Sequence, residues 1–356
     1  MELEQMLSIL VEHRIVNQTN PAAQVSSLQG DFNYLGTVYQ SNSNIRDLYG
    51  NWVPQDPSEA QIRQNVTEYC ILPLGSAFVR SKAPFVKSLL LYGPKGCGKT
   101  MLAQAVANHT GAVFLNLSPS NLEGKFAEKN GPAKLMHMAF AVARAPQLGP
   151  AVIYLDEVEK YFTGKKKGGD GAARFKKDLV TYANSLKPEE HVVLIGCTNQ
   201  PWSIPDGELK DLRNVFEKHL YIPFASYASR VMLWKRSISA LLAPTGHQLP
   251  DEFDISTLAQ ISEGYSAGSI LHAAKRTLNT RRIERADKRP FAEGEFLSAL
   301  SRCPRTYGDD NVKFRNFTAV VTGLKLRRDK LKAALAGDEG GDGKGKKGKG
   351  KKKKKK

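Results

Sequence analysis

The stretch that decides the fold reads Gly93-Pro94-Lys95-Gly96-Cys97-Gly98-Lys99-Thr100, which fits the pattern G-x-x-x-x-G-K-T. Its three glycines let the backbone curve until its N–H groups face phosphate oxygens, because side chains would block this close approach. Lys99 can reach the β and γ phosphates, and the Thr100 hydroxyl can ligate Mg²⁺. The stretch, together with the adjoining Met101, is therefore predicted to bind ATP.

The segments on either side give this loop a strand–loop–helix context. Ser88–Tyr92 is a short apolar run that predicts a buried strand, and residues 101–109 are rich in Ala, Leu and Gln, which favours a helix. The N-terminal end of that helix would add its dipole to phosphate binding. A glycine-rich turn that matched the pattern by chance would have no reason to lie between a strand and a helix, so we favour a phosphate loop.

Composition is that of an ordinary soluble globular chain, with 41% hydrophobic and 24% charged residues among 356. An acidic start argues against a secretory signal, and the chain has no apolar run near the length of a membrane span. The cysteines lie far apart and form no C-x-x-C pair, which argues against zinc and disulfides and favours a reducing, intracellular compartment. These cysteines are Cys70, Cys97, Cys197 and Cys303.

Apolar runs and helical stretches alternate through the middle of the chain. Strands are predicted at Ser88–Tyr92, Val113–Leu117, Ala151–Leu155, Val192–Gly196 and His219–Ile222. Helices are predicted at 100–109, 131–144, 172–186 and 208–216, and after the last strand at 227–242, 254–263, 266–285 and 291–303. This alternation predicts an α/β fold, a parallel sheet with helices on both faces, followed by a small helical lid.

Four segments follow from this pattern. Residues 1–55 form an N-terminal helix and linker, 56–225 the large ATP-binding subdomain, 226–336 the lid and C-terminal helices, and 337–356 a disordered tail. The helix predicted over residues 1–18 has an apolar face that needs cover. Either a partner helix or its own domain could provide that cover.

Carboxylates follow the strand predicted at Ala151–Leu155, 57 residues after Lys99. The carboxyl edge of the sheet would place them beside the phosphate loop, where Asp156 would hold Mg²⁺ through its water shell and Glu157 would polarise the attacking water. Another apolar strand ends in Asn199, which we expect to help hold this water rather than only start a turn.

This order of parts resembles the AAA family of ATPases from about residue 56 to 302. Glu217-Lys218-His219-Leu220-Tyr221-Ile222-Pro223 is similar to a segment of its katanin, spastin and Vps4 branch, and Glu263-Gly264-Tyr265-Ser266-Ala267-Gly268-Ser269-Ile270 to its sensor 2 segment. The resemblance implies a P-loop sheet with a helical lid and a hexameric ring.

The chain departs from that branch at two places. Where relatives carry arginines that act on a neighbour's ATP, this chain has Asn214 and Val215, so that Arg213 alone remains as a catalytic candidate and slow hydrolysis is expected. The central-pore loop retains Phe126, which could grip a polypeptide or simply pack on its own domain.

A narrower resemblance is to the IQ and AAA domain-containing proteins, which include a subunit of the axonemal nexin–dynein regulatory complex. It rests on residues 92–100, 116–122, 175–179 and 197–202, and on the Gly/Lys tail. It implies other subunits of that complex as partners, and a place in the cytoplasm and cytoskeleton, in the axoneme of cilia or flagella. The chain has no recognisable IQ motif, so a calmodulin site is not supported.

The tail explains part of the net charge of +17, because residues 338–356 contain ten lysines and three acids. A flexible polycation binds polyanions without reading their shape. Acidic tubulin tails on microtubules are the partner that we favour. Nucleic acid is disfavoured because no recognition motif accompanies the charge, no membrane partner is expected, and a purely solubilising tail remains an alternative.

The sequence therefore predicts an ATP-binding, slowly hydrolysing AAA module, with Mg²⁺ as its metal, that acts as a subunit of the dynein regulatory complex in motile cilia. The alternative is a ring-forming remodelling ATPase, or a microtubule-directed one, of the katanin, spastin and Vps4 type. The phosphate loop, Asp156, Glu157 and Asn199 suit both readings. The altered arginine positions count against the second.

Overall fold

The structure is a computed structural model that describes residues 2–32, 56–163, 171–250, 252–305 and 308–339. The middle of the predicted linker therefore lies outside the described residues. So does the predicted tail from residue 340 onward.

The described residues form strands β1 (Val16–Asn17), β2 (Ser88–Tyr92), β3 (Val113–Asn116), β4 (Ala151–Leu155), β5 (Val192–Thr198) and β6 (Lys218–Tyr221). The described α-helices before the last strand are α1 (Leu3–Glu12), α3 (Glu59–Val66), α4 (Leu72–Gly75), α5 (Ala77–Lys82), α6 (Lys99–Thr110), α7 (Pro119–Leu122), α8 (Gly131–Ala143), α9 (Lys176–Asn184) and α10 (Leu209–Val215). Those that follow are α11 (Tyr227–Leu242), α12 (Ile255–Ile261), α13 (Ala267–Thr277), α14 (Thr280–Ile283), α15 (Glu293–Leu300), α16 (Gly308–Val321) and α17 (Leu324–Glu339). Short 3₁₀ or π turns join several of them.

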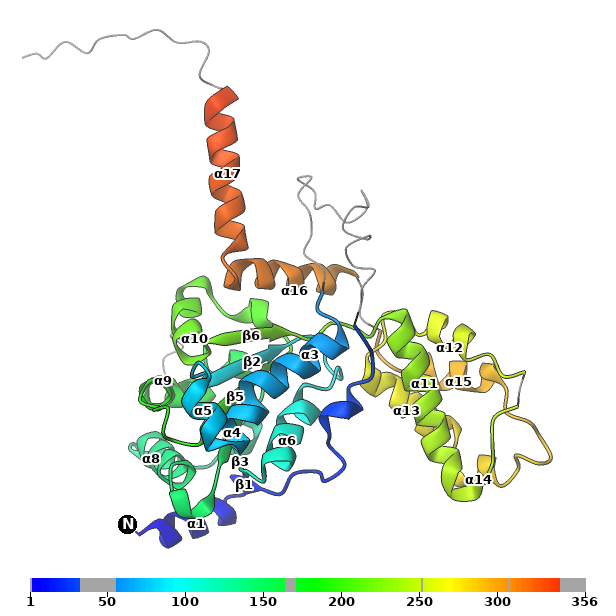
Figure 1. Ribbon diagram of the computed structural model, residues 1–356, viewed down its shortest axis with the longest axis horizontal. Coiled ribbons are helices and arrows are strands. Elements are labelled where there is room, and N and C mark those ends of the chain that lie inside the picture. Colours follow the sequence, from blue (N-terminus) through cyan, green and yellow to red (C-terminus); the bar gives the residue numbers. More distant parts are fainter. Residues whose placement is uncertain (1, 33–55, 164–170, 251, 306–307, 340–356) are drawn as a thin grey trace, which may run out of the picture. The chain divides into compact units, whose positions relative to one another are not determined.

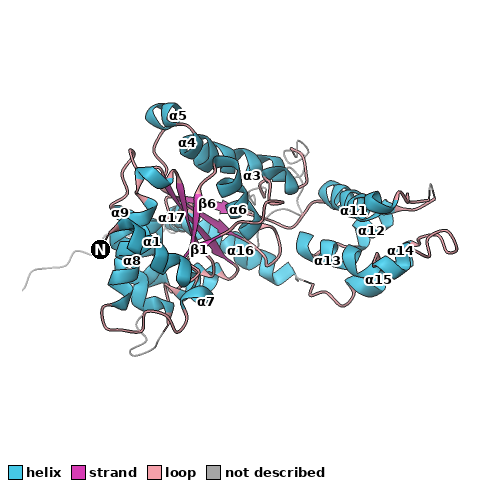
Figure 2. Ribbon diagram, turned by 90° about the horizontal axis from the view of Figure 1, so that it is seen from below, coloured by secondary structure: helices cyan, strands magenta, loops and turns pink. Residues whose placement is uncertain are grey.

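The strands form one sheet in the order β1-β3-β4-β5-β2-β6, and every pairing except β1 with β3 is parallel. Helices α3 to α6 cover one face and α8 to α10 the other (Figures 1 and 2). The predicted fold class is confirmed. Because the strands are parallel, the residues that follow β2, β4 and β5 meet at one edge of the sheet.

Side chains alternate between the two faces along each buried strand. Leu89 and Leu91 of β2 join a core cluster with Ile62 and Val66 of α3 and Val106 of α6, all 1% exposed or less. Burying a side chain of this size stabilises the fold by about 1.5–3 kcal/mol. Helices α3 and α6 are therefore anchored directly to the strand that carries the phosphate loop.

The N-terminal segment departs from its prediction as one helix over residues 1–18. Helix α1 ends at Glu12, Arg14 takes a left-handed φ of 54°, and β1 pairs antiparallel with β3, which makes β1 the edge strand of the sheet. The Asn116 N–H donates to the Ile15 carbonyl at 2.6 Å, and Ile15 is fully buried. Pairing with an open sheet edge outcompetes local helix propensity here. Helix α1 packs on α8, so its apolar face is covered within its own domain.

The lid, helices α11 to α15, has a core of its own around Trp234, whose ring meets Phe296 edge-on at 5.7 Å. The helix predicted at 266–285 is broken in two. Asn279 lies between α13 and α14, and its side chain accepts from the Arg282 N–H at 3.0 Å as the N-cap of α14. Asparagine competes with a continuing helix in this way.

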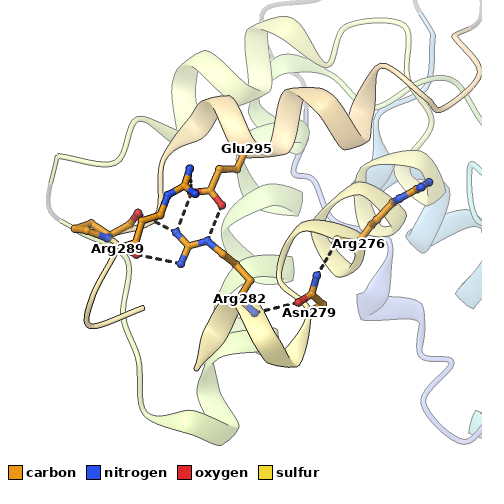
Figure 3. A network of polar contacts seen from close by, with 6 residues as sticks. Arg276, Asn279, Arg282, Arg289 and Glu295 are labelled. Carbon is orange, nitrogen blue, oxygen red and sulfur yellow. Dashed lines mark hydrogen bonds and ion pairs between the residues drawn. The ribbon is translucent and has the colours of Figure 1, made fainter. Parts of the chain in front are cut away.

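An ion pair fastens the end of the lid (Figure 3). Arg282 donates to Glu295 of α15 through two nitrogens, at 2.6 and 2.8 Å, and to the carbonyls of Arg289 and Pro290 at 3.0 and 2.9 Å. The Arg282 side chain is 12% exposed and that of Glu295 is 18% exposed. A bidentate pair of this kind adds geometric specificity as well as energy, so it holds residues 282–290 against α15.

The chain divides into two compact units, residues 1–314 and 315–356. At the end of the first, the Phe314 ring packs on Trp202 and Tyr221, with centroids 4.8 and 5.6 Å apart. The second contains α17, which runs three residues into the predicted tail. No described helix combines the length and apolar character that crossing a membrane requires.

Candidate functional site

The phosphate loop lies between β2 and α6, and its glycines are required by their surroundings. Gly93 has φ +157°, and a Cβ on it would lie 2.2 Å from the Ile222 carbonyl oxygen. Gly96 has φ +85°, and a Cβ there would meet the Ser266 hydroxyl at 2.5 Å. A left-handed φ and close neighbours together exclude larger residues. The loop is thus pressed between the sheet and the lid.

Lys99, the first residue of α6, is buried at 6% exposure. Its Nζ donates to the carbonyl oxygens of Gly93 and Pro94, at 2.7 and 2.6 Å. Burial lowers the pKa of this amine, while the nearby Asp156 acts in the opposite direction. The Lys99 amine therefore lies against the loop backbone, where it can donate to phosphate oxygens in place of these carbonyl oxygens.

Asp156 is positioned by the strand next to its own. Its backbone N–H donates to the Ser118 hydroxyl at 2.9 Å, and that hydroxyl donates to the Asn116 side-chain oxygen at 2.6 Å. Ser118 is 3% exposed. The sequence interpretation missed this serine, and its only signal was its place just after a strand that neighbours β4.

Glu157 points to a different partner from the one expected. It has a left-handed φ of 45°, and its carboxylate makes an ion pair with Lys160 at 2.6 Å. Its side chain is 34% exposed. Glu157 is not among the described residues that line the cavity, whereas Asp156 and Asn199 are. The sequence interpretation missed this ion pair. The only signal for it was that Lys160 follows Glu157 by three residues.

A cavity of about 490 Å³ joins the phosphate loop to the lid. Lys95 to Met101, Asp156 and Asn199 line it. The apolar side chains of Leu28, Ile222, Leu233 and Leu271 line it as well. A cavity of this volume that combines apolar walls with a few polar groups suits a nucleotide, which has an apolar base and charged phosphates. Met101, predicted to bind ATP, belongs to this lining as well.

The walls of the cavity are fastened to each other. The Gly268 N–H donates to the Gly96 carbonyl at 2.9 Å, which ties the lid to the phosphate loop. Glu59 accepts from the Ser226 N–H at 3.3 Å, and burial raises the pKa of its carboxyl. Arg63 donates to the Leu28 carbonyl at 2.7 Å, which holds this part of the N-terminal segment against the cavity that Leu28 lines.

Besides Glu157, four predicted residues lie outside the cavity lining as described: Gly93, Pro94, Phe126 and Arg213. Arg213 is exposed on α10, followed by exposed Asn214 and fully buried Val215. Phe126 is half-buried and its ring packs on His13 at 4.8 Å, which agrees with the alternative that it packs on its own domain. A role for Arg213 on a neighbouring chain remains a prediction.

His219, the second residue of β6, gives a pH test. Burial, and then the charge of Arg213, lower its pKa from 6.5 to about 4. The unfolded chain therefore binds more protons between these values, and stability falls as the pH drops through this window. We expect this residue alone to reduce the free energy of unfolding by about 2 kcal/mol from pH 7 to pH 5.

Urea unfolding at both pH values measures this effect. His219→Gln should remove about 2 kcal/mol of the pH dependence, whereas His109→Gln, on an exposed position, should leave it unchanged. Equal pH dependence in wild type and His219→Gln would contradict the prediction.

Comparisons with known proteins agree with these features. Residues 89–224 match the family model described as "ATPase family associated with various cellular activities (AAA)". The chain is 34% identical to Dynein regulatory complex protein 11 of Mus musculus, over 89% of this chain and 36% of that protein. It is 31% identical to Spastin of Ixodes scapularis, over 71% of this chain and 39% of that protein. It thus spans well under half of either relative.

A solved structure shows the same fold. The crystal structure of the FIGL-1 AAA domain is 21% identical in sequence, with a TM-score of 0.63, and the match covers 90% of this chain and 95% of that one. The same domain in complex with ADP gives a TM-score of 0.61 at 22% identity. The resemblances expected from the motifs are confirmed as similarities.

Proposed function

This chain carries an AAA ATPase domain, and from that premise we propose that it binds ATP with Mg²⁺ and hydrolyses it slowly. The observation that carries the proposal is the cavity of about 490 Å³. In it Lys95 to Met101 of the phosphate loop, Asp156 and Asn199 share one space with apolar residues of the lid, Leu233 and Leu271 among them. Family membership supports ATP hydrolysis for AAA domains in general, and this chain's own turnover is part of the proposal.

The residues present fit a magnesium ion. Among the described residues, no group of three His, Cys, Asp or Glu side chains could hold a metal alone. Thr100 and Asp156 offer two oxygen donors in the cavity, which suits Mg²⁺ because it keeps several waters and shares phosphates. Bound there, the metal would neutralise charge on the phosphates.

The chain's own groups would do the remaining work. Lys99 binds the β and γ phosphates, Asn199 holds the attacking water, and Glu157 polarises it after leaving Lys160. Hydrolysis would be slow because Val215 is buried in α10 and cannot reach a neighbouring chain's nucleotide as an arginine would. Arg213 is the one exposed arginine of the segment 213–216.

We also propose that the module works as a subunit of the axonemal dynein regulatory complex in motile cilia. The 34% identity to Dynein regulatory complex protein 11 supports this placement. Other subunits of that complex would be its partners, and the Lys-rich end of the chain would bind acidic tubulin tails on microtubules. The similarity to Spastin favours the alternative, a ring-forming ATPase, while Val215 and the packed Phe126 count against it.

The ATPase rate per chain, measured against protein concentration, separates the two functions. A docking module with a self-contained site should give a slow rate that stays within about 2-fold over a 100-fold range of concentration. A rate that rises steeply with concentration would favour ring assembly instead. Arg213→Ala is the matched variant, because it should lower the rate only where a neighbouring chain uses this side chain.

A further inference from the structure

A hydroxyl group lies directly behind the predicted magnesium ligand. The Thr100 Oγ1 and the Tyr154 hydroxyl oxygen are 2.9 Å apart. Tyr154 is the fourth residue of β4, is 3% exposed and stacks on Phe114 of β3, with ring centroids 5.3 Å apart. A central strand and a neighbouring ring therefore fix the position of this hydroxyl.

The direction of this hydrogen bond follows from the chemistry of a metal ligand. Either oxygen could donate across the 2.9 Å contact. A Thr100 oxygen that gives a lone pair to a cation must direct its proton elsewhere, and the Tyr154 oxygen is its hydrogen-bond partner. The Tyr154 oxygen is then an acceptor for the Thr100 proton.

This direction matters for metal binding. A threonine hydroxyl has one proton and two lone pairs, and a cation can use only the lone pairs. When Tyr154 accepts the proton, a lone pair of Thr100 stays available on the side that faces the cavity. Thr100 lines that cavity beside Asp156.

We propose that Tyr154 is a positioning residue for Mg²⁺, which accepts the Thr100 proton and thereby orients the threonine oxygen toward the metal. The inference rests on the proposed function, since it concerns the same nucleotide site. Groups behind a metal ligand act in this way in many proteins, and their loss typically costs 10–100-fold in metal affinity. Phenylalanine would fill the same space without accepting a proton.

The test measures the metal's contribution to nucleotide binding. ADP is titrated by calorimetry into wild type and Tyr154→Phe, once with MgCl₂ and once with EDTA, and the ratio of the two dissociation constants is compared. We expect Tyr154→Phe to lower this ratio about 10-fold and to leave ADP binding in EDTA within about 2-fold. A ratio equal to that of wild type would overturn the inference.

Controls separate positioning from general stability. Tyr161→Phe removes another fully buried hydroxyl, one that donates to the Leu117 carbonyl, and should leave the ratio unchanged. In a Thr100→Ala background, Tyr154→Phe should have no further effect on the ratio, because the metal ligand is already gone. An undiminished effect in that background would contradict the proposed route through Thr100.

If wild type binds no ADP even with MgCl₂, the proposed nucleotide function fails; if it binds ADP and the ratio ignores Tyr154, only this inference fails.

Discussion

Replacing Lys99 by alanine is expected to weaken ATP and ADP binding by about 100-fold or more. The amine is the one buried cation in the described lining of the cavity, and it lies at the point where α6 begins. Hydrogen bonds from a charged donor to phosphate contribute about 1.5–3 kcal/mol each, and Lys99 can make more than one. A loss of about 3 kcal/mol corresponds to about 100-fold in affinity.

Lys99→Ala removes hydrogen bonds within the loop as well as a charge. In the structure the amine donates to the Gly93 and Pro94 carbonyls, so it also closes the loop from within. Its removal leaves two carbonyls without their present donor, which loosens the same backbone that must present N–H groups to phosphate. Both effects reduce binding.

Calorimetry with ADP and MgCl₂ measures the prediction, and Lys95→Ala is the matched control. Lys95 belongs to the same loop and also lines the cavity, but it is exposed, so its charge is screened. We expect that control to weaken binding by less than about 3-fold. Thermal unfolding without nucleotide checks that both variants fold. Affinity retained within about 3-fold in Lys99→Ala would refute a phosphate role for this lysine.

The parts that sequence predicted well depend on local signals. The runs at Ser88–Tyr92 and Ala151–Leu155, and the helix at Tyr227–Leu242, have the bounds expected, because an uninterrupted apolar or amphipathic run reports its own burial. The tight turn at residues 93–98 was equally clear, because Gly93 and Gly96 have a positive φ and neighbours too close for a side chain. Phosphate binding by this turn stays a prediction.

The parts that sequence missed depend on contacts between distant residues. Strand β1 forms because β3, nearly a hundred residues later in the chain, offers unpaired backbone groups at the edge of the sheet. A strand of two residues is too short to show an alternating sequence pattern. The contact of Ser118 with Asp156, and that of Tyr154 with Thr100, likewise join different elements. In the sequence pattern of a buried strand, Tyr154 cannot be told from an apolar residue, because the hydrogen-bond partner of its hydroxyl is known only from the structure.

Glu157→Gln is expected to lower ATP turnover by about 100-fold or more while ATP binding stays within about 3-fold. A positioned general base contributes about 10²–10⁴ to the rate, and an amide cannot take the proton of the attacking water. Binding should persist because Lys99 and Thr100 line the cavity whereas Glu157 does not. Single-turnover assays measure hydrolysis, and nucleotide retained on the purified variant should be ATP.

The ion pair with Lys160 allows a second test of Glu157 as the group that polarises water. Because the carboxylate is 2.6 Å from the Lys160 amine, it must leave that partner to reach a water on the γ phosphate. Lys160→Met should therefore raise turnover several-fold, and the increase should vanish when it is combined with Glu157→Gln. Lys160→Arg, which keeps the ion pair, should resemble wild type.

A neighbouring carboxylate provides the competing explanation. Glu159 has one oxygen buried with no hydrogen-bond partner among the described residues, and burial raises the pKa of its carboxyl. If Glu157→Gln turned over ATP at the wild-type rate while Glu159→Gln did not, the base would be Glu159. We expect the reverse, because Glu157 directly follows Asp156 at the carboxyl end of β4 and its carboxylate is partly exposed to water, whereas one oxygen of Glu159 is buried.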